Sequence, residues 1–389
     1  MHVRRPAAAL LLLAALVVGC GSQAAPGSQS SRASGSWVQV AESPLGPRES
    51  ATLVWTGHEV LVLGGDTSPC PPNADCMAPA DTPRAVAAYD PAADTWREVA
   101  PLPYSPQWPR AVATGNAVYV LDGGGAQPVR FLSWTPDVDT WQELPAPPGR
   151  PTGLTAVGNQ LVAYQTSLEN GPAPDSVFDP ATGEWTPLPE PPGTPGFDRT
   201  VFALGDHSLA LLDLELVPNP GADGPTLYRA AVLDLGTSAW RRLPASDVAG
   251  LGAGWHAVGD LLISASTQTV DGGEVGNYGR DVPTGGILDP ENGRWSALPA
   301  RADSAPGPAA GDVAGDDVVV TDGWALHVTH GRWERLPDLD GLDGVGGQAS
   351  VWAGDRLMVW GGARFDDETP SGELLGTGWT WQPAEQSAP

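Results

Sequence analysis

Residues 176–193 read SVFDPATGEWTPLPEPPG, and one spacing within them decides the fold: Phe178 is followed seven positions later by Trp185. The same interval separates an apolar residue from a tryptophan in four further places, and a sixth copy keeps Trp333 after a shorter turn. The four pairs are Tyr89 and Trp96, Trp134 and Trp141, Leu233 and Trp240, and Leu288 and Trp295. Repetition at a fixed period predicts a repeat architecture.

A second repeat runs in phase with the first. In each copy a glycine stands between two short apolar runs, at Gly57, Gly115, Gly158, Gly205, Gly259, Gly315 and Gly354. Runs of Val, Leu and aromatic residues bounded by Gly, Asn, Asp and Pro favour strands, and the glycine steps favour hairpins. With 49 glycines and 41 prolines in 389 residues, long helices are disfavoured. Each of seven units of about 50 residues is therefore predicted to be a four-stranded antiparallel sheet whose fourth strand carries the tryptophan.

These units resemble the kelch repeat of β-propellers. The residues that carry the resemblance are the glycine doublets Gly64-Gly65, Gly123-Gly124 and Gly361-Gly362, the segment from Tyr89-Asp90-Pro91 to Trp96, and Pro47-Arg48. The likeness extends from Ser36 onward, although the third, fourth and fifth repeats lack the double glycine. It implies an all-β, seven-bladed propeller.

Both ends of the repeat region indicate how such a ring closes. Trp381-Gln382-Pro383 aligns with Tyr89-Asp90-Pro91, but too few residues follow for another turn and strand. Trp37 instead reads as a fourth strand that has no first three strands before it. We therefore expect residues 36–389 to form the propeller, with the N-terminal strand completing the last blade and leaving no open sheet edge. The tryptophans are expected to pack between neighbouring blades.

The first 35 residues read as an export signal and a tether. Residues 1–19 combine Arg4 and Arg5 with a short apolar run, as in a signal peptide. Val17-Val18-Gly19-Cys20 resembles the bacterial lipobox, which implies lipidation of Cys20 and a place on the extracytoplasmic face of the cell membrane. An ordinary secreted protein with a fortuitous cysteine is the alternative. Residues 20–35 are Gly- and Ser-rich, as in a flexible tether.

Charge and cysteine content limit the classes of partner and of metal site that we expect. The formal net charge of −26 and the absence of lysine disfavour nucleic acid, and they exclude lysine chemistry. We expect the membrane to be contacted only through the lipid. Cys70 and Cys76 flank a short loop, and in an exported chain a local disulfide is expected. Two cysteines are too few for a zinc site, so no metal is assigned.

Candidate ligand-binding residues lie on the long loops. In every unit the connections between the second and third strands, and between units, fall at one end and vary in length, which is where binding residues usually lie. Merely tolerated insertions are the alternative. The candidates are Arg48, Arg150, Arg199, Arg280, Arg364, Tyr104 and Tyr278. Arginines could hold a carboxylate through paired hydrogen bonds.

The function expected from these features is non-catalytic: a monomeric, membrane-tethered binding scaffold for a protein or glycan at the cell surface. No catalytic residue or cofactor is assigned. The alternative is a carbohydrate-active enzyme resembling propeller sialic-acid epimerases or sialidases, although the Ser-x-Asp-x-Gly boxes of sialidases are missing. Convergence of three arginines and an acid on one pocket would favour the enzyme, and their dispersal would disfavour it.

Overall fold

The chain divides into two units, Met1–Ala33 and Ser34–Pro389. The computed structural model describes residues 35–71, 82–123, 128–168, 174–193, 195–216, 225–250, 254–271, 281–301, 307, 311–339, 341, 344–365 and 372–383, all in the second unit. The predicted signal peptide, Cys20 and almost all of the tether lie outside the described residues. Those residues contain strands and turns but no helix, and so none that could cross a membrane. The predicted all-β class is confirmed.

Seven four-stranded antiparallel sheets account for most of the described strands. We number them in chain order. Sheet 1 comprises β2 (Thr52–Trp55), β3 (Val60–Leu63), β4 (Val86–Asp90) and β5 (Thr95–Val99); sheet 2, β6 (Pro109–Thr114), β7 (Ala117–Asp122), β8 (Arg130–Thr135) and β9 (Thr140–Leu144); sheet 3, β10 (Gly153–Val157), β11 (Gln160–Tyr164), β12 (Ser176–Asp179) and β13 (Glu184–Pro187); sheet 4, β14 (Gly196–Leu204), β15 (Ser208–Glu215), β16 (Tyr228–Asp234) and β17 (Ala239–Arg242).

The remaining three large sheets follow the same strand order. Sheet 5 comprises β18 (His256–Val258), β19 (Leu261–Ser264), β22 (Gly286–Asp289) and β23 (Arg294–Ser296); sheet 6, β24 (Val313–Ala314), β25 (Val318–Thr321), β26 (Trp324–His327) and β27 (Arg332–Arg335); sheet 7, β29 (Ala349–Ala353), β30 (Arg356–Trp360), β33 (Gly378–Trp381) and β1 (Trp37–Gln39). The fourth strand of sheet 7 thus comes from the other end of the described chain, with Trp37 opposite Trp381.

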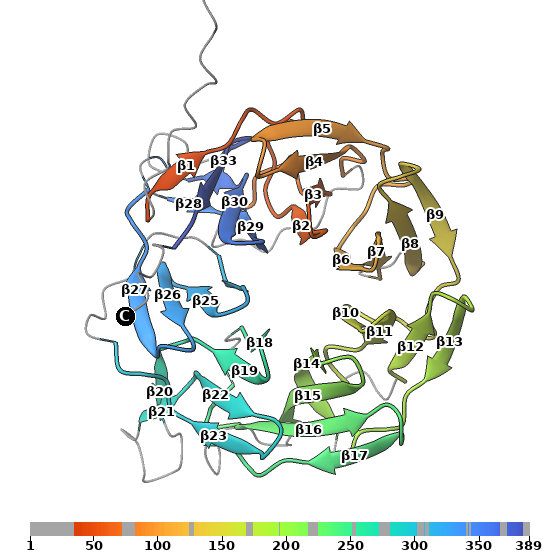
Figure 1. The fold of residues 1–389 in the computed structure, drawn as a ribbon, viewed down its shortest axis with the longest axis vertical. Helices are drawn as coiled ribbons and strands as arrows, with labels where there is room; N and C mark the ends of the chain where they lie inside the picture. The colour runs from red at the N-terminus through yellow and green to blue at the C-terminus, as the bar shows by residue number, and fades with distance from the viewer. Residues whose placement is uncertain are drawn as a thin grey trace, which may run out of the picture. The chain divides into compact units, whose positions relative to one another are not determined.

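Neighbouring sheets meet through their first strands. β2 lies beside β6, β6 beside β10, β10 beside β14, β14 beside β18, β18 beside β24, β24 beside β29, and β29 beside β2. Figure 1 shows the sheets following one another in chain order, with these strands innermost. The arrangement is consistent with a propeller-like fold.

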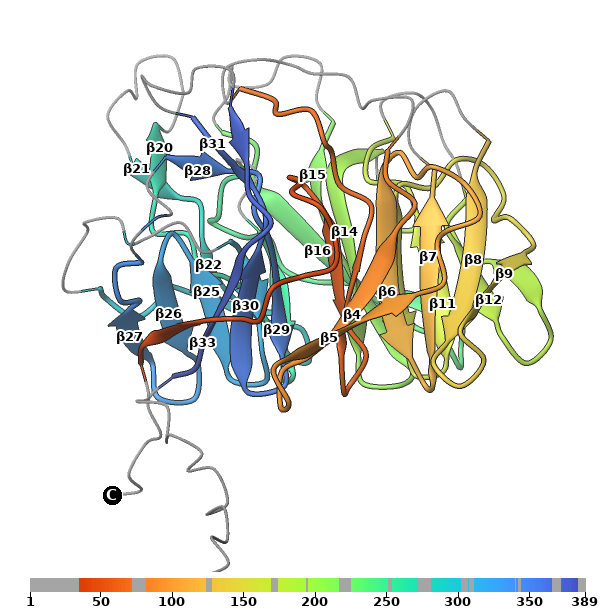
Figure 2. The same ribbon diagram turned by 90° about the horizontal axis from the view of Figure 1, so that it is seen from above.

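Two small sheets extend the long connections. β20 (Thr269–Asp271) pairs with β21 (Asp281–Pro283), and β28 (Val345–Gly346), β31 (Ala363–Arg364) and β32 (Glu373–Leu374) form a three-stranded sheet. Figure 2 shows β20, β21, β28 and β31 at one end of the larger strands. The variable connections were predicted to gather at this end, which we call the loop end.

The tryptophan of every fourth strand packs between two sheets. In seven hydrophobic clusters of the described residues, a different one of these half-buried indoles lies against each core. Each indole Nε1 also donates a hydrogen bond of 2.7–3.0 Å to a backbone carbonyl that follows the fourth strand of the preceding sheet. The pairs are Trp37 with Pro337, Trp96 with Ala41, Trp141 with Ala100, Trp185 with Pro145, Trp240 with Pro189, Trp295 with Pro244, and Trp333 with Pro299. The predicted packing role is therefore confirmed.

Candidate functional site

Arg48 is held inside the protein by backbone carbonyls. Its side chain is 3% exposed; Nη1 donates to the carbonyl oxygen of Gly64 at 3.0 Å and Nε to that of Gly46 at 3.1 Å. Burial lowers the pKa of its guanidinium. In this position Arg48 ties the link before β2 to the end of β3.

Arg199 forms a buried ion pair at the loop end of sheets 3 and 4. Its Nη2 lies 2.6 Å from Oδ2 of Asp175, and Nη1 donates to the carbonyl oxygen of Gln165. Both charged side chains are less than a tenth exposed. Burial is the main cause of the raised pKa of Tyr164, and the nearby charges of Arg110, Asp175 and Arg199 have smaller effects on it.

Arg364 and Tyr104 are also in contact with other residues of the chain. Arg364 donates from Nη2 to the carbonyl oxygen of Gly341 at 2.6 Å and from Nη1 to Glu373 at 3.3 Å. Arg150 is exposed. Tyr104 lies under the guanidinium of Arg130, 4.6 Å from its ring centre, and burial raises the pKa of its hydroxyl. Arg280 and Tyr278 lie outside the described residues.

None of the three cavities bordered by described residues brings the arginine candidates together. Arg199 borders a cavity between sheets 3 and 4, whereas Arg48, Arg150 and Arg364 border neither that cavity nor the two between sheets 2 and 3. Their role as ligand-binding residues stays a prediction. Cys70 is disulfide-bonded; its expected partner, Cys76, lies outside the described residues. Among the residues that are described, no three His, Cys, Asp or Glu side chains group as metal ligands.

Two cavities open at the loop end. One, of about 470 Å³, lies between sheets 3 and 4, with the Arg199–Asp175 pair among prolines and leucines: Leu168, Pro174, Leu188, Pro189, Pro191 and Pro195. A smaller one, of about 220 Å³, lies between sheets 2 and 3 beside Trp108 and Arg110. The backbone N–H groups of Gln107 and Trp108 donate to the buried carboxylate of Asp122, which fixes the segment that carries the half-exposed indole of Trp108.

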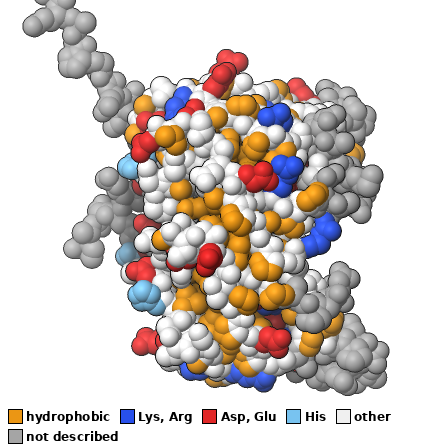
Figure 3. All heavy atoms as spheres, turned by 90° about the vertical axis from the view of Figure 1, so that its right-hand side faces the viewer, with side chains coloured by type: hydrophobic (Ala, Val, Ile, Leu, Met, Phe, Trp, Pro, Cys, Tyr) orange, Lys and Arg blue, Asp and Glu red, His pale blue; other side chains and the backbone are white. Residues whose placement is uncertain are grey.

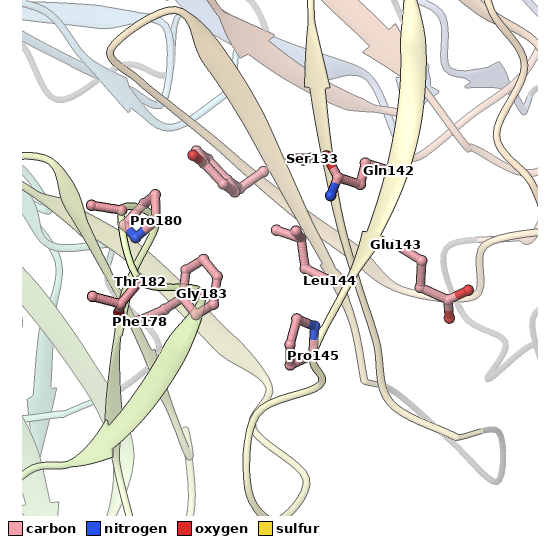
Figure 4. A pocket seen from close by; sticks show the side chains of 11 residues that line it. Ser133, Gln142, Glu143, Leu144, Pro145, Phe178, Pro180, Thr182 and Gly183 are labelled. Carbon is pink, nitrogen blue, oxygen red and sulfur yellow. The ribbon is translucent and has the colours of Figure 1, made fainter.

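The third cavity, of about 430 Å³, lies between sheets 2 and 3. We call it the inter-sheet groove; its lining is Tyr119, Ser133, Gln142, Glu143, Leu144, Pro145, Phe178, Pro180, Ala181, Thr182 and Gly183. Figure 4 shows Gln142, Leu144 and Pro145 on one side and Pro180 and Thr182 on the other, while the Glu143 carboxylate points away. Figure 3 shows that side of the molecule, where charged side chains are scattered among hydrophobic and uncharged ones.

Strand register places the polar residues of the groove in one row. Tyr119 of β7 pairs with Ser133 of β8, and Ser133 pairs with Gln142 of β9, so all three side chains emerge from the same face of sheet 2. Two positions further along each strand, Leu121, Phe131 and Leu144 form the neighbouring row on the same face. These three residues contact Phe178 and Trp185 in one hydrophobic cluster, so this face packs on sheet 3. Within the described part of the chain, no side-chain hydrogen bond is made by Tyr119, Ser133 or Gln142.

In the other six sheets, the second-strand residue of the equivalent row is apolar. The residues equivalent to Tyr119 are Leu61, Val162, Ala210, Ile263, Val320 and Met358. Packing between sheets therefore does not require a phenol at this position. Burial raises the pKa of the Tyr119 hydroxyl, so it stays protonated and can donate as well as accept.

A longer side chain fills the equivalent space in two other sheets. Arg97, equivalent to Gln142, lies 5.7 Å from the ring centre of Trp134 in the next sheet. Arg241 donates from Nη2 to the carbonyl oxygen of Pro290 in the next sheet at 2.8 Å. Gln142 is shorter than arginine and leaves the groove open between sheets 2 and 3. A row-by-row comparison of the repeats, which the sequence alone permits, would have singled out Tyr119.

No protein-family model and no curated protein matches the chain. The groove, the two loop-end cavities and the arginine contacts are therefore the observations on which a function must rest.

Proposed function

We propose that residues 36–389 form a seven-bladed, kelch-like propeller closed by the N-terminal strand, and that a lipid on Cys20 holds it outside the cytoplasmic membrane. The pairing of β1 with β33 and the hydrogen bond from Trp37 to Pro337 support the closure. The run of residues 1–20 supports export and lipidation. Residues 20–35 would keep the propeller close to the membrane surface.

The propeller acts as a non-catalytic scaffold that binds a protein or glycan at the cell surface. One observation carries this proposal: the inter-sheet groove presents a row of hydrogen-bonding side chains that have no partner in the described part of the chain. Tyr119, Ser133 and Gln142 lie opposite one another on three paired strands, so the backbone positions that carry them are set before a ligand arrives. Such pre-organisation lowers the entropy cost of binding.

The enzyme alternative finds less support among the described residues. It requires arginines and an acid around one pocket, whereas Arg48 is bonded to carbonyls, Arg199 is paired with Asp175, and Arg364 with Glu373. A buried arginine already neutralised by a carboxylate gains little from a second one. Two further candidates, Arg280 and Tyr278, lie outside the described residues and neither support nor oppose it.

Capture from the native envelope tests the proposal. The full chain, a Gln142→Arg variant and a Thr186→Arg control would each be cross-linked to envelope proteins and applied to a glycan array. Gln142→Arg places in the groove the side chain that sheets 1 and 4 carry there, whereas Thr186 is the equivalent exposed position of sheet 3. We expect a ligand that is captured by the natural chain and the control but lost with Gln142→Arg. Equal capture by all three would refute the groove as the binding site.

A further inference from the structure

We infer that the inter-sheet groove takes a neutral saccharide. This inference rests on the proposed function and names the class of ligand for the same site. Three features of the groove point to it: the charge of its lining, its mixture of donors and acceptors, and its shape.

Among the described residues that border the groove, none is a cation and the one charged residue is Glu143, whose carboxylate lies 3.7 Å from Nη1 of Arg130 and points away from the groove. An anionic sugar or a phosphate would meet no positive partner among these residues, in a protein whose net charge is −26. Charge disfavours anionic ligands at this site.

The polar groups are of the type that bind sugar hydroxyls. Tyr119, Ser133 and Thr182 offer hydroxyl groups and Gln142 an amide, and each of these both donates and accepts. Among the described residues, the Thr182 hydroxyl makes one long contact, from Oγ1 to the carbonyl oxygen of Asp179 at 3.4 Å. A saccharide hydroxyl has the same dual character, so neither side of such a contact is left unsatisfied.

Apolar surface lies beside these groups. Tyr119, Leu144, Pro145 and Pro180 form the apolar part of the wall; Phe178 also borders it but is only 1% exposed. Alternation of apolar and hydroxyl-binding surface suits a sugar ring, whose C–H groups and hydroxyls point in different directions. A volume of about 430 Å³ falls in the range of small-ligand sites, about 300–1,000 Å³. A folded protein partner would instead need about 800 Å² of surface from each side.

Calorimetric titration of the full chain tests the inference. The probes are neutral hexose and N-acetylhexosamine oligosaccharides, uronate-containing oligosaccharides of the same length, and inorganic phosphate. We expect heat of binding for at least one neutral oligosaccharide and none for the anions. Tyr119→Phe, which keeps the ring and removes one hydroxyl, should weaken binding about threefold to tenfold. Gln142→Arg should abolish it, and Thr186→Arg should leave it unchanged.

The outcomes separate this inference from the proposed function. If neutral oligosaccharides fail to bind while an envelope protein is captured in a manner that depends on Gln142, the scaffold function stands and the ligand class is wrong. Tighter binding of the uronate series, or equal binding by the Gln142→Arg chain, would also overturn the inference. If neither sugars nor envelope proteins depend on Gln142, both proposals fail. Circular dichroism of each variant checks that the sheets still form.

Discussion

The indole Nε1 of Trp37 donates a hydrogen bond of 2.8 Å to the carbonyl oxygen of Pro337, a residue 300 positions later in the chain. Six other tryptophans make the same bond to the preceding sheet, but this one alone joins the beginning of the described chain to its sixth sheet. Because β1 contributes only three residues to sheet 7, the Trp37 contact adds an anchor to the short pairing of β1 with β33.

Replacing Trp37 should therefore weaken the whole fold. Trp37→Phe removes one partly buried hydrogen bond and should cost about 1 kcal/mol, and Trp37→Ala, which also removes the ring, should cost about 3 kcal/mol. Urea unfolding followed by tryptophan fluorescence measures both. Trp108→Phe is the matched control, because Trp108 is 50% exposed and lies outside the set of seven. Equal effects of Trp37→Phe and Trp108→Phe would contradict the closing role.

In two of the seven links between sheets, a second hydrogen bond accompanies the bond from tryptophan to carbonyl. The sequences of these two links differ from those of the other five. Ala100, whose carbonyl accepts from Trp141, also donates its N–H to Oδ1 of Asp139, and Asp139 accepts from the indole of Trp134. Ala41 and Asp94 repeat the arrangement in sheet 1. In the other five links the carbonyl residue is a proline, which has no N–H, and the position of the aspartate is Gly183, Ser238, Gly293, Gly331 or Gly35.

A double-mutant cycle tests this pairing. Asp139→Gly should cost about 1–3 kcal/mol, because it strands the buried Trp134 donor, although it relieves a positive φ of 46°. Ala100→Pro should cost less in the Asp139→Gly background than in the natural chain, with a coupling of about 0.5–1.5 kcal/mol. Additive unfolding free energies would show that the two residues act independently.

Much of the fold could be predicted from the sequence because its determinants are local and repeated. Hairpin glycines and the interval of seven between Phe178 and Trp185 place strands without knowledge of distant contacts. The pairing of Trp37 with Trp381 was also predictable, since each end lacked what the other supplied. The site was harder to predict. The roles of Arg48 and Arg199 depend on carbonyls and a carboxylate that tertiary structure brings to them, and no local pattern marks those partners.

The inter-sheet groove was also hard to predict from local sequence patterns. In the sequence, Gln142 looks like any polar residue of a strand. Its importance comes from its place on sheet 2, where it borders the groove that separates sheet 2 from sheet 3. Only the register that aligns it with Arg97 and Arg241 indicates that a space has been left unfilled.

The buried ion pair between Arg199 and Asp175 should be costly to break. Asp175→Asn leaves the guanidinium in a nearly water-free position with half of its bidentate partner, and a loss of about 3–5 kcal/mol of unfolding free energy is expected. Asp338→Asn, in the exposed pair with Arg335, is the control and should cost less than about 1 kcal/mol. Chemical denaturation at neutral pH measures both, and similar small losses would mean that water reaches Arg199.

Glu49 makes stability depend on pH in a direction opposite to that of a surface carboxylate in an ion pair. Its side chain is 4% exposed, Oε1 accepts the N–H of Cys70 at 2.6 Å, and its backbone pairs with that of Asp66. Burial raises its pKa above the ordinary value of 4.5; the hydrogen bond from Cys70 acts against this rise, and the charge of Asp66 adds to it. The folded state therefore binds this proton more tightly than the unfolded state. Stability should fall as pH rises from the ordinary value through the raised one.

Substitution of Glu49 isolates this contribution. Glu49→Gln keeps an oxygen for the Cys70 N–H and has no charge to bury, so its unfolding free energy should exceed that of the natural chain at pH 7. The difference should shrink as pH is lowered toward 4, where Glu49 is mostly protonated in both states. Glu184→Gln, on an exposed position of β13, controls for removing one negative charge from an acidic protein. A difference that does not change between pH 4 and pH 7 would place Glu49 in contact with solvent.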